Sequence, residues 1–108
     1  MNNVVKISLL AIVLMAVGTF GAFNAKWIRD GIVPWWMTYF ISAFTASIWA
    51  YQARANIMPL TTAAVFQHFF FHASWYAAMV FLIKEHLSVM KIVGIVTAFI
   101  GMMIMSLG

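Results

Sequence analysis

The chain has 108 residues, of which 66% are hydrophobic and 7% charged, with a formal net charge of +4. A soluble domain carries about 25% charged residues, so this composition predicts an integral membrane protein with one domain over residues 1–108. The lack of cysteine excludes disulfides, thiol catalysis and thiolate metal sites. The isolated lysines and arginines form no cluster of the kind that binds nucleic acid, so we expect the lipid bilayer as the first partner.

Four apolar segments separated by short polar breaks predict four membrane-spanning helices. Each segment is close to the roughly 20 residues that cross about 30 Å of hydrocarbon. Short connections make neighbouring helices antiparallel, so we expect an all-α, up-and-down four-helix bundle with both termini on one side of the cytoplasmic membrane. Pro34 and Pro59 open two of the segments, and Ser88 is the expected N-cap of the last. The predicted spans cover about residues 4–23, 33–52, 58–83 and 87–107.

Charge sets the orientation of these spans only weakly. Lys6 and Arg54 fall on the side that holds the termini, and four cations fall on the other. The positive-inside rule therefore favours the first and third loops in the cytoplasm, by a margin small enough for both orientations to occur.

Small side chains recur every three or four residues along the first predicted span. Gly18 and Ala22 belong to this stripe, and residues on such a stripe share one helix face. Small residues let membrane helices approach closely, so this face is predicted to pack against another helix.

Polar and aromatic residues form stripes at helical spacing on the second and third spans. One interpretation is a cavity that binds a substrate, because polar groups at mid-membrane turn inward. The other is that the hydroxyls bond to carbonyls one turn earlier in their own helix. The candidate substrate-binding residues are Thr38, Ser42, Thr45, Trp49, Gln67, His68, His72 and Trp75.

The sequence HFFFH places His68 and His72 four residues apart, on one face of the third span. This spacing suits two metal ligands, but zinc takes four, or three from the protein in catalytic sites. A dimer could supply two more histidines, and a haem could take one histidine from each of two chains. The simpler alternative is a pair of neutral imidazoles that face protein, with Ser42 and Thr45 as the expected partners. We therefore predict no cofactor and no metal bound by this chain alone.

The fourth span carries its own row of small residues. Gly94 and Gly101 lie two turns apart on one face, with Ala98 between them. This row predicts a second close helix contact, either within the chain or with a partner.

Several segments resemble the drug/metabolite transporter superfamily. They are AVGTFGAF (16–23), WAYQARAN (49–56), Pro59 at the start of the third span, and KEHLSVMKIVGIVTAFIGMMIMSLG (84–108). The likeness is to the small multidrug resistance proteins and to a related uncharacterised four-helix family, and it implies a four-helix bundle and a dimer.

The chain departs from both families at the residues expected to carry chemistry. Met15 stands where the small multidrug resistance proteins have the first-helix glutamate that binds cations and protons, and FFFH replaces their third-helix glycine kink. Gln67-His68 stands where the uncharacterised family has a Gln-Glu pair. The resemblance therefore implies the bundle and no coupling residue.

We expect no enzymatic activity, because the acidic residues Asp30 and Glu85 fall in predicted loops without a carboxylate partner. Two other functions remain open. The first is a transporter that moves a neutral or weakly charged small molecule or a lipid headgroup as an oligomer. The second is a non-catalytic subunit of a larger membrane complex, such as a membrane enzyme. The first implies a homodimer and the second other membrane subunits as partners.

Overall fold

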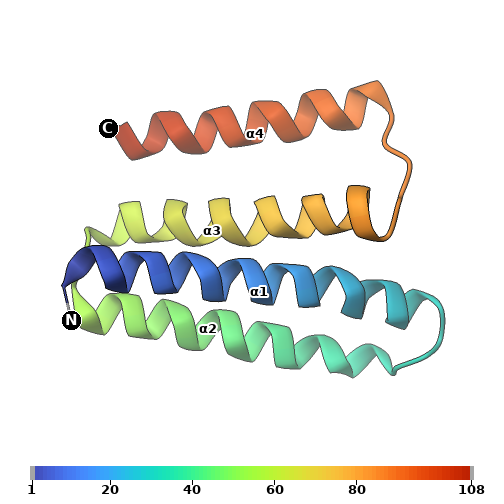
Figure 1. Cartoon of the computed structure of the whole chain (residues 1–108), viewed down its shortest axis with the longest axis horizontal. Coiled ribbons are helices and arrows are strands. Elements are labelled where there is room, and N and C mark those ends of the chain that lie inside the picture. Colours follow the sequence, from blue (N-terminus) through green and yellow to red (C-terminus); the bar gives the residue numbers. More distant parts are fainter. Residues whose placement is uncertain (1, 108) are drawn as a thin grey trace.

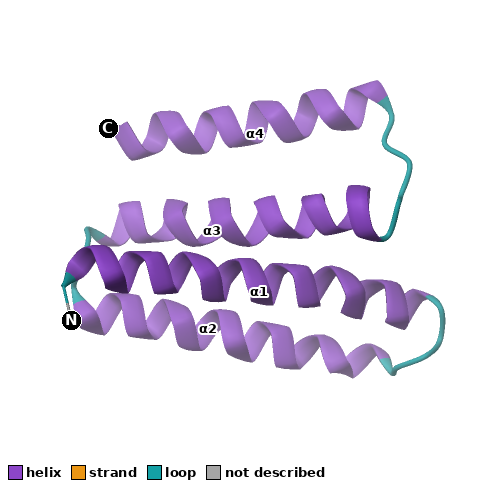
Figure 2. Cartoon of the chain, viewed as in Figure 1, coloured by secondary structure: helices purple, strands orange, loops and turns teal. Residues whose placement is uncertain are grey.

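The computed structural model of the chain describes residues 2–107 and all their side chains except that of residue 106. Within this range the protein is all-helical and contains no strand (Figure 2). Four long helices run alternately in opposite directions, and both ends of the chain lie at the same end of the bundle (Figure 1). The elements are α1 (Asn3–Arg29), the 3₁₀ helix η1 (Trp35–Met37), α2 (Thr38–Ala55), α3 (Leu60–Ala77), the π-helical segment η2 (Ala78–Leu82) and α4 (Val89–Leu107).

Local signals explain where the first two helices begin and end. The Asn2 side chain accepts a hydrogen bond from the Val5 N–H at 2.9 Å and so caps the first turn of α1. Beyond α1, Gly31 has a φ of +77° and donates its N–H to the Ile28 carbonyl. Asn56 ends α2 in the left-handed conformation, which asparagine tolerates better than most residues.

The third and fourth helices begin at the predicted residues. Pro59 directly precedes α3, where a missing N–H leaves no intrahelical bond unmade. The Ser88 hydroxyl accepts from the Lys91 N–H at 3.3 Å, which confirms it as the cap of α4.

The predicted end of the first helix is wrong. Residues 24–29 were assigned to a polar break, but α1 continues through them to Arg29. Cations stabilise the C-terminal end of a helix, where the carbonyl dipoles point outward. Lys26 also bonds Asp30 at 2.9 Å, and Arg29 lies 3.5 Å from the same carboxylate. Asp30 lies outside the helix, and the Lys26 hydrogen bond holds the pKa of this carboxyl below its usual 3.8, with Arg29 acting in the same direction.

The bundle is asymmetric. Helices α1, α2 and α3 contact one another, whereas α4 contacts only α3 among the described elements. The molecule is a slab of 41 × 31 × 19 Å, with α4 at one edge (Figure 1). One broad side of α4 therefore has no neighbour within residues 2–107.

The buried apolar core is small, and its members come from α1, α2, α3 and η2. It consists of Leu10, Leu14, Ala22, Ile41, Ala63, Val65 and Ala78. Among the described helices, α1 is the one whose length and apolar composition suffice to cross a membrane, and the apolar stretch Val89–Met105 of α4 is shorter.

Candidate functional site

Helices α1 and α3 are in close contact at two glycines of α1. A methyl group added to Gly18 would overlap the Ser74 hydroxyl and the Phe71 carbonyl oxygen. A Cβ on Gly21 would lie 2.6 Å from Cζ3 of Trp75. Both glycines are buried, as is Ala22 one turn from Gly18. The small stripe of the first helix thus packs against another helix, and we call this contact the α1–α3 seam.

Three predicted site residues lie at or near this interior. The Trp75 indole covers Gly21 and lies 5.6 Å from the Phe71 ring, measured between centroids. Trp49 is half-buried on α2. Gln67 bridges α3 to α2 through its side-chain amide.

A chain of amides connects α2 and α3. The Gln52 Nε2 donates to Gln67 Oε1 at 2.8 Å, and Gln67 Nε2 donates to the Thr45 carbonyl at 3.1 Å. Gln52 is only 2% exposed, and its Oε1 has no hydrogen-bond partner within residues 2–107. Gln52 shares the polar stripe of the second span but was not among the predicted site residues.

The hydroxyls of α2 bond to their own helix. Ser42 donates to the Thr38 carbonyl at 3.4 Å, and Thr45 donates to the Ile41 and Ser42 carbonyls at 3.1 and 3.0 Å. Thr38 and Ser42 are exposed and Thr45 is half-buried. Of the two interpretations of the second-span stripe, back-bonding is therefore the arrangement found for these hydroxyls.

The two histidines of HFFFH lie side by side on α3. His68 is exposed and His72 half-buried, with ring centroids 5.6 Å apart and ring planes within 10° of parallel. Neither imidazole has a hydrogen-bond partner in the described part of the chain, so the expected bonds to Ser42 and Thr45 are wrong. Helical spacing fixes that the two rings share a face, whereas the packing of α1 against α3 decides which face is covered.

An aromatic row continues from His72 toward α4. Its ring lies 6.2 Å from that of Tyr76, which in turn meets Phe99 of α4 edge-on at 6.3 Å. Phe69 also meets Phe99, at 5.3 Å. Phe99 is therefore the ring through which α4 joins α3.

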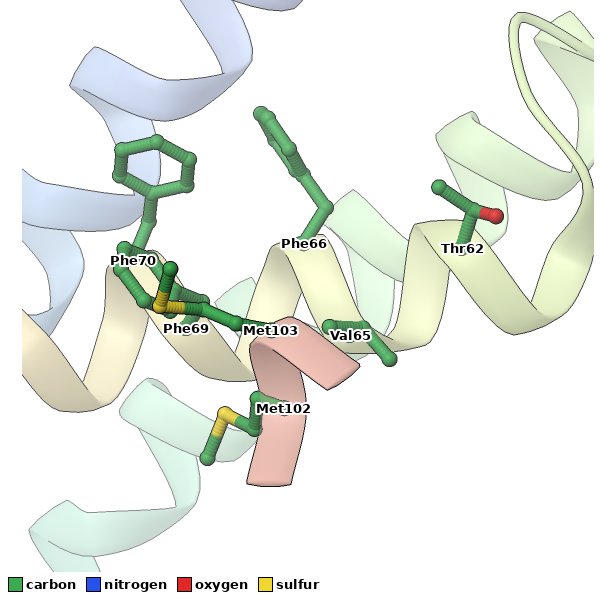
Figure 3. Close-up of a pocket in the computed structure, with 7 residues that line it drawn as sticks. All are labelled: Thr62, Val65, Phe66, Phe69, Phe70, Met102 and Met103. Carbon is green, nitrogen blue, oxygen red and sulfur yellow. The ribbon is translucent and has the colours of Figure 1, made fainter. Parts of the chain in front are cut away.

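Two hollows flank this α3–α4 contact. The first, of about 240 Å³, is mostly apolar. Figure 3 shows Phe66 and Phe70 of α3 projecting to the same side and Met103 of α4 beside Phe69, with Met102 also in the lining. The second, of about 380 Å³, combines apolar walls with polar groups, and we call it the α3–α4 groove. It is lined by Tyr76, Met79, Val80, Glu85, Leu87, Lys91, Gly94, Ile95 and Ala98.

The small residues of α4 differ in their surroundings from those of α1. A Cβ on Gly94 or Gly101 would meet no atom within 4 Å, so neither glycine packs closely against a helix of this chain. Gly94 and Ala98 line the α3–α4 groove. None of the eight predicted substrate-binding residues lines that groove. No sequence pattern indicates the groove, because it depends on how far α4 stands from α3.

Within residues 2–107 no group of three or more His, Asp, Glu or Cys side chains is placed to hold a metal ion. Comparison with known protein families, curated proteins and solved structures finds no match to this chain.

Proposed function

We propose that the chain is a multi-pass membrane protein that assembles as an oligomer and moves a small, net-neutral polar molecule or lipid headgroup. The distribution of side chains supports the membrane part of this proposal. Large apolar side chains lie outside, as with Ile104 at 64% exposed, while the amide of Gln52 is buried. Only 22% of the most apolar stretch of α1 is buried, whereas a core helix of a soluble protein is mostly buried.

The exposed apolar side chains and the lengths of the helices also favour a lipid bilayer as the environment of this chain. Each large apolar side chain left in water forgoes about 1.5–3 kcal/mol of burial, and the outer side of α4 carries many of them. At 1.5 Å per residue, the 18 residues of α2 and the 19 of α4 span about 27–29 Å, close to the roughly 30 Å of a bilayer core.

The asymmetry of the bundle supports an oligomer. Among the described elements α4 contacts only α3, and a Cβ on either of its glycines would meet no atom within 4 Å. Small residues on a free helix face permit the backbone of a second chain to approach closely.

The α3–α4 groove is the observation that favours transport. Its volume of about 380 Å³ lies in the range of about 300–1,000 Å³ typical of small-molecule sites. Glu85 and Lys91 both line it, and neither is ion-paired in the described structure. One carboxylate and one ammonium over an apolar body complement a zwitterion with an apolar part.

Coupling to protons through a carboxylate is not part of this proposal. Met15, in the resemblance to the small multidrug resistance proteins, stands at the glutamate position, and a thioether exchanges no proton. We therefore expect no proton-driven efflux of quaternary cations from reconstituted vesicles.

Topology is tested with single cysteines, since the chain has none. Asn2→Cys and Leu107→Cys are labelled with a membrane-impermeant maleimide in intact and permeabilised cells. We expect both positions to show the same sidedness within each molecule. Opposite sidedness, or extraction of the chain by alkaline carbonate, would refute the four-span proposal.

Transport is tested in vesicles with a fluorescent phosphatidylcholine analogue, a neutral sugar and a quaternary cation. We expect faster movement of one of the first two than in empty vesicles, and a several-fold loss with Tyr76→Ala in the groove. Tyr39→Ala is the matched control, because Tyr39 lies on α2, outside the groove. If the protein moves none of these probes and co-purifies with stoichiometric other subunits, the accessory-subunit alternative replaces transport.

A further inference from the structure

We infer that His68 and His72 are half of a transition-metal site, and that a second copy of the chain supplies the other half with the same two side chains. The ligand class is a late first-row metal ion, because imidazole nitrogen suits zinc, copper, nickel and cobalt. The inference rests on the paired state proposed above and is independent of transport.

The placement of the pair suits chelation from one helix. Two imidazoles bound to one tetrahedral ion, with metal–nitrogen distances of about 2.0–2.1 Å, have ring centroids about 5 Å apart. The His68 and His72 centroids are 5.6 Å apart. The rings are now nearly parallel, and rotation about χ2, which has broad preferences in histidine, turns one nitrogen of each toward a common point.

The surroundings leave the pair without another role inside the chain. Neither imidazole hydrogen-bonds to a described residue. The Ser42 and Thr45 hydroxyls, which were the expected partners, donate instead to carbonyls of their own helix. A polar group at mid-membrane without a partner costs free energy, so the pair needs a partner from outside the chain. An ion bound to both ring nitrogens removes that cost.

In a two-fold symmetric dimer, histidines alone can complete the coordination of the metal ion. Zinc and related ions take four ligands in closed sites, and this chain brings two. In a symmetric dimer each surface meets its own copy, so a pair close to the axis becomes a set of four. The pair is also central along its helix: His68 is eight residues after Leu60, and His72 is ten residues before Leu82. Parallel and antiparallel partners therefore both bring the two pairs to the same depth.

The surface beside the pair has room for a second chain. The His72 ring stacks toward Tyr76, which lines the α3–α4 groove together with Gly94 and Ala98. No atom lies within 4 Å of a Cβ built on Gly94. Neither histidine lines the groove and His68 is exposed, so a second chain can approach the pair beside the groove without filling it.

The test uses the full chain, purified in mild detergent without a polyhistidine tag and stripped with EDTA. Cobalt(II) is titrated while its visible absorption and the molar mass by light scattering are followed. We expect one cobalt per two chains, an intense tetrahedral spectrum and a larger dimer fraction with metal than with EDTA. His68→Gln and His72→Gln each remove a ligand, so affinity should fall by more than the roughly 10–100-fold that loss of an outer-shell partner costs.

His86→Ala is the matched control, because His86 lies between η2 and α4, outside the pair. It should bind cobalt as the wild type does. Circular dichroism checks that the glutamine variants stay folded, and the wild-type stoichiometry tests the site without any variant. Four results would overturn the metal site alone. They are a dimer that binds no cobalt, a stoichiometry of one ion per chain, a loss of cobalt affinity in His86→Ala equal to that in the glutamine variants, and a haem spectrum in the purified protein. A chain that is monomeric at every concentration, with metal or EDTA, would overturn the paired state.

Discussion

Replacing Gly18 by alanine is expected to destabilise the fold, because the α1–α3 seam has no space for a methyl group. The added Cβ would overlap both the Ser74 hydroxyl and the Phe71 carbonyl oxygen. The hydroxyl can rotate, but the carbonyl belongs to the backbone of α3, so the helices must move apart. Overpacking of this kind costs about 1–3 kcal/mol.

A gain in helix propensity opposes this cost. Alanine is better than glycine in a helix interior by about 1 kcal/mol, which leaves Gly18→Ala less stable than the wild type by about 0–2 kcal/mol. Gly94→Ala is the matched control, since it has the same gain and no atom within 4 Å of the new Cβ. The difference between the two variants isolates the overpacking cost.

The assay is thermal unfolding in detergent with EDTA, at a chain concentration for which light scattering gives the molar mass of the monomer. For a domain of this size, 1 kcal/mol corresponds to roughly 4–8 °C in Tm, so Gly18→Ala should melt well below Gly94→Ala. Adding Ser74→Ala to Gly18→Ala should restore only part of the loss, because the carbonyl remains. If Gly18→Ala melts with or above Gly94→Ala, the two helices are not in backbone contact and the reasoning is wrong.

Three further predictions concern other parts of the chain. Gln67→Leu should cost about 1–3 kcal/mol because it strips the buried Gln52 amide of its partner, and Gln52→Leu/Gln67→Leu should be closer to wild type in the same unfolding assay. Gly94→Leu and Gly101→Leu should weaken self-association, measured by energy transfer between labelled chains, while leaving monomer stability intact; unchanged association would show that this face meets lipid. Because the pKa of Asp30 is lowered in the fold, its ionised carboxylate stabilises the fold at pH values above the unfolded pKa, and this contribution disappears as the pH falls from about 4 through the folded pKa. Asp30→Asn should therefore flatten the small decline in Tm over that pH window, and a decline identical to that of the wild type would contradict the prediction.

Sequence patterns predicted the four helices well because apolar length and polar punctuation are local properties. Pro59 and Ser88 mark helix starts by chemistry that needs no tertiary contact. The charged residues near the end of α1 misled the prediction because cations both interrupt apolar runs and stabilise helix ends. The π-helical turn after Ala77 had no signal in composition.

Site prediction was less complete because it depends on which faces meet. The stripe containing Gly18 indicated a close contact but not its partner, which is α3 rather than the neighbour in sequence, α2. The histidine spacing indicated one shared face but not its exposure. The α3–α4 groove, with Glu85 and Lys91 at its wall, arises from the separation of two helices and so could not be inferred from either helix alone.

The α1–α3 seam has a consequence for the time course of synthesis. Gly18 meets Ser74, so the first helix waits for 56 more residues before its main partner exists. At roughly 5–20 residues per second, this interval is about 3–11 s. Throughout it the glycine face of α1 is uncovered by α3, and once synthesis has passed Ala55 the whole of α2 is also present. The first two helices therefore form a nascent hairpin without its closest contact, and a chaperone or insertion factor that recognises this protein early would meet α1 on the face that α3 later covers.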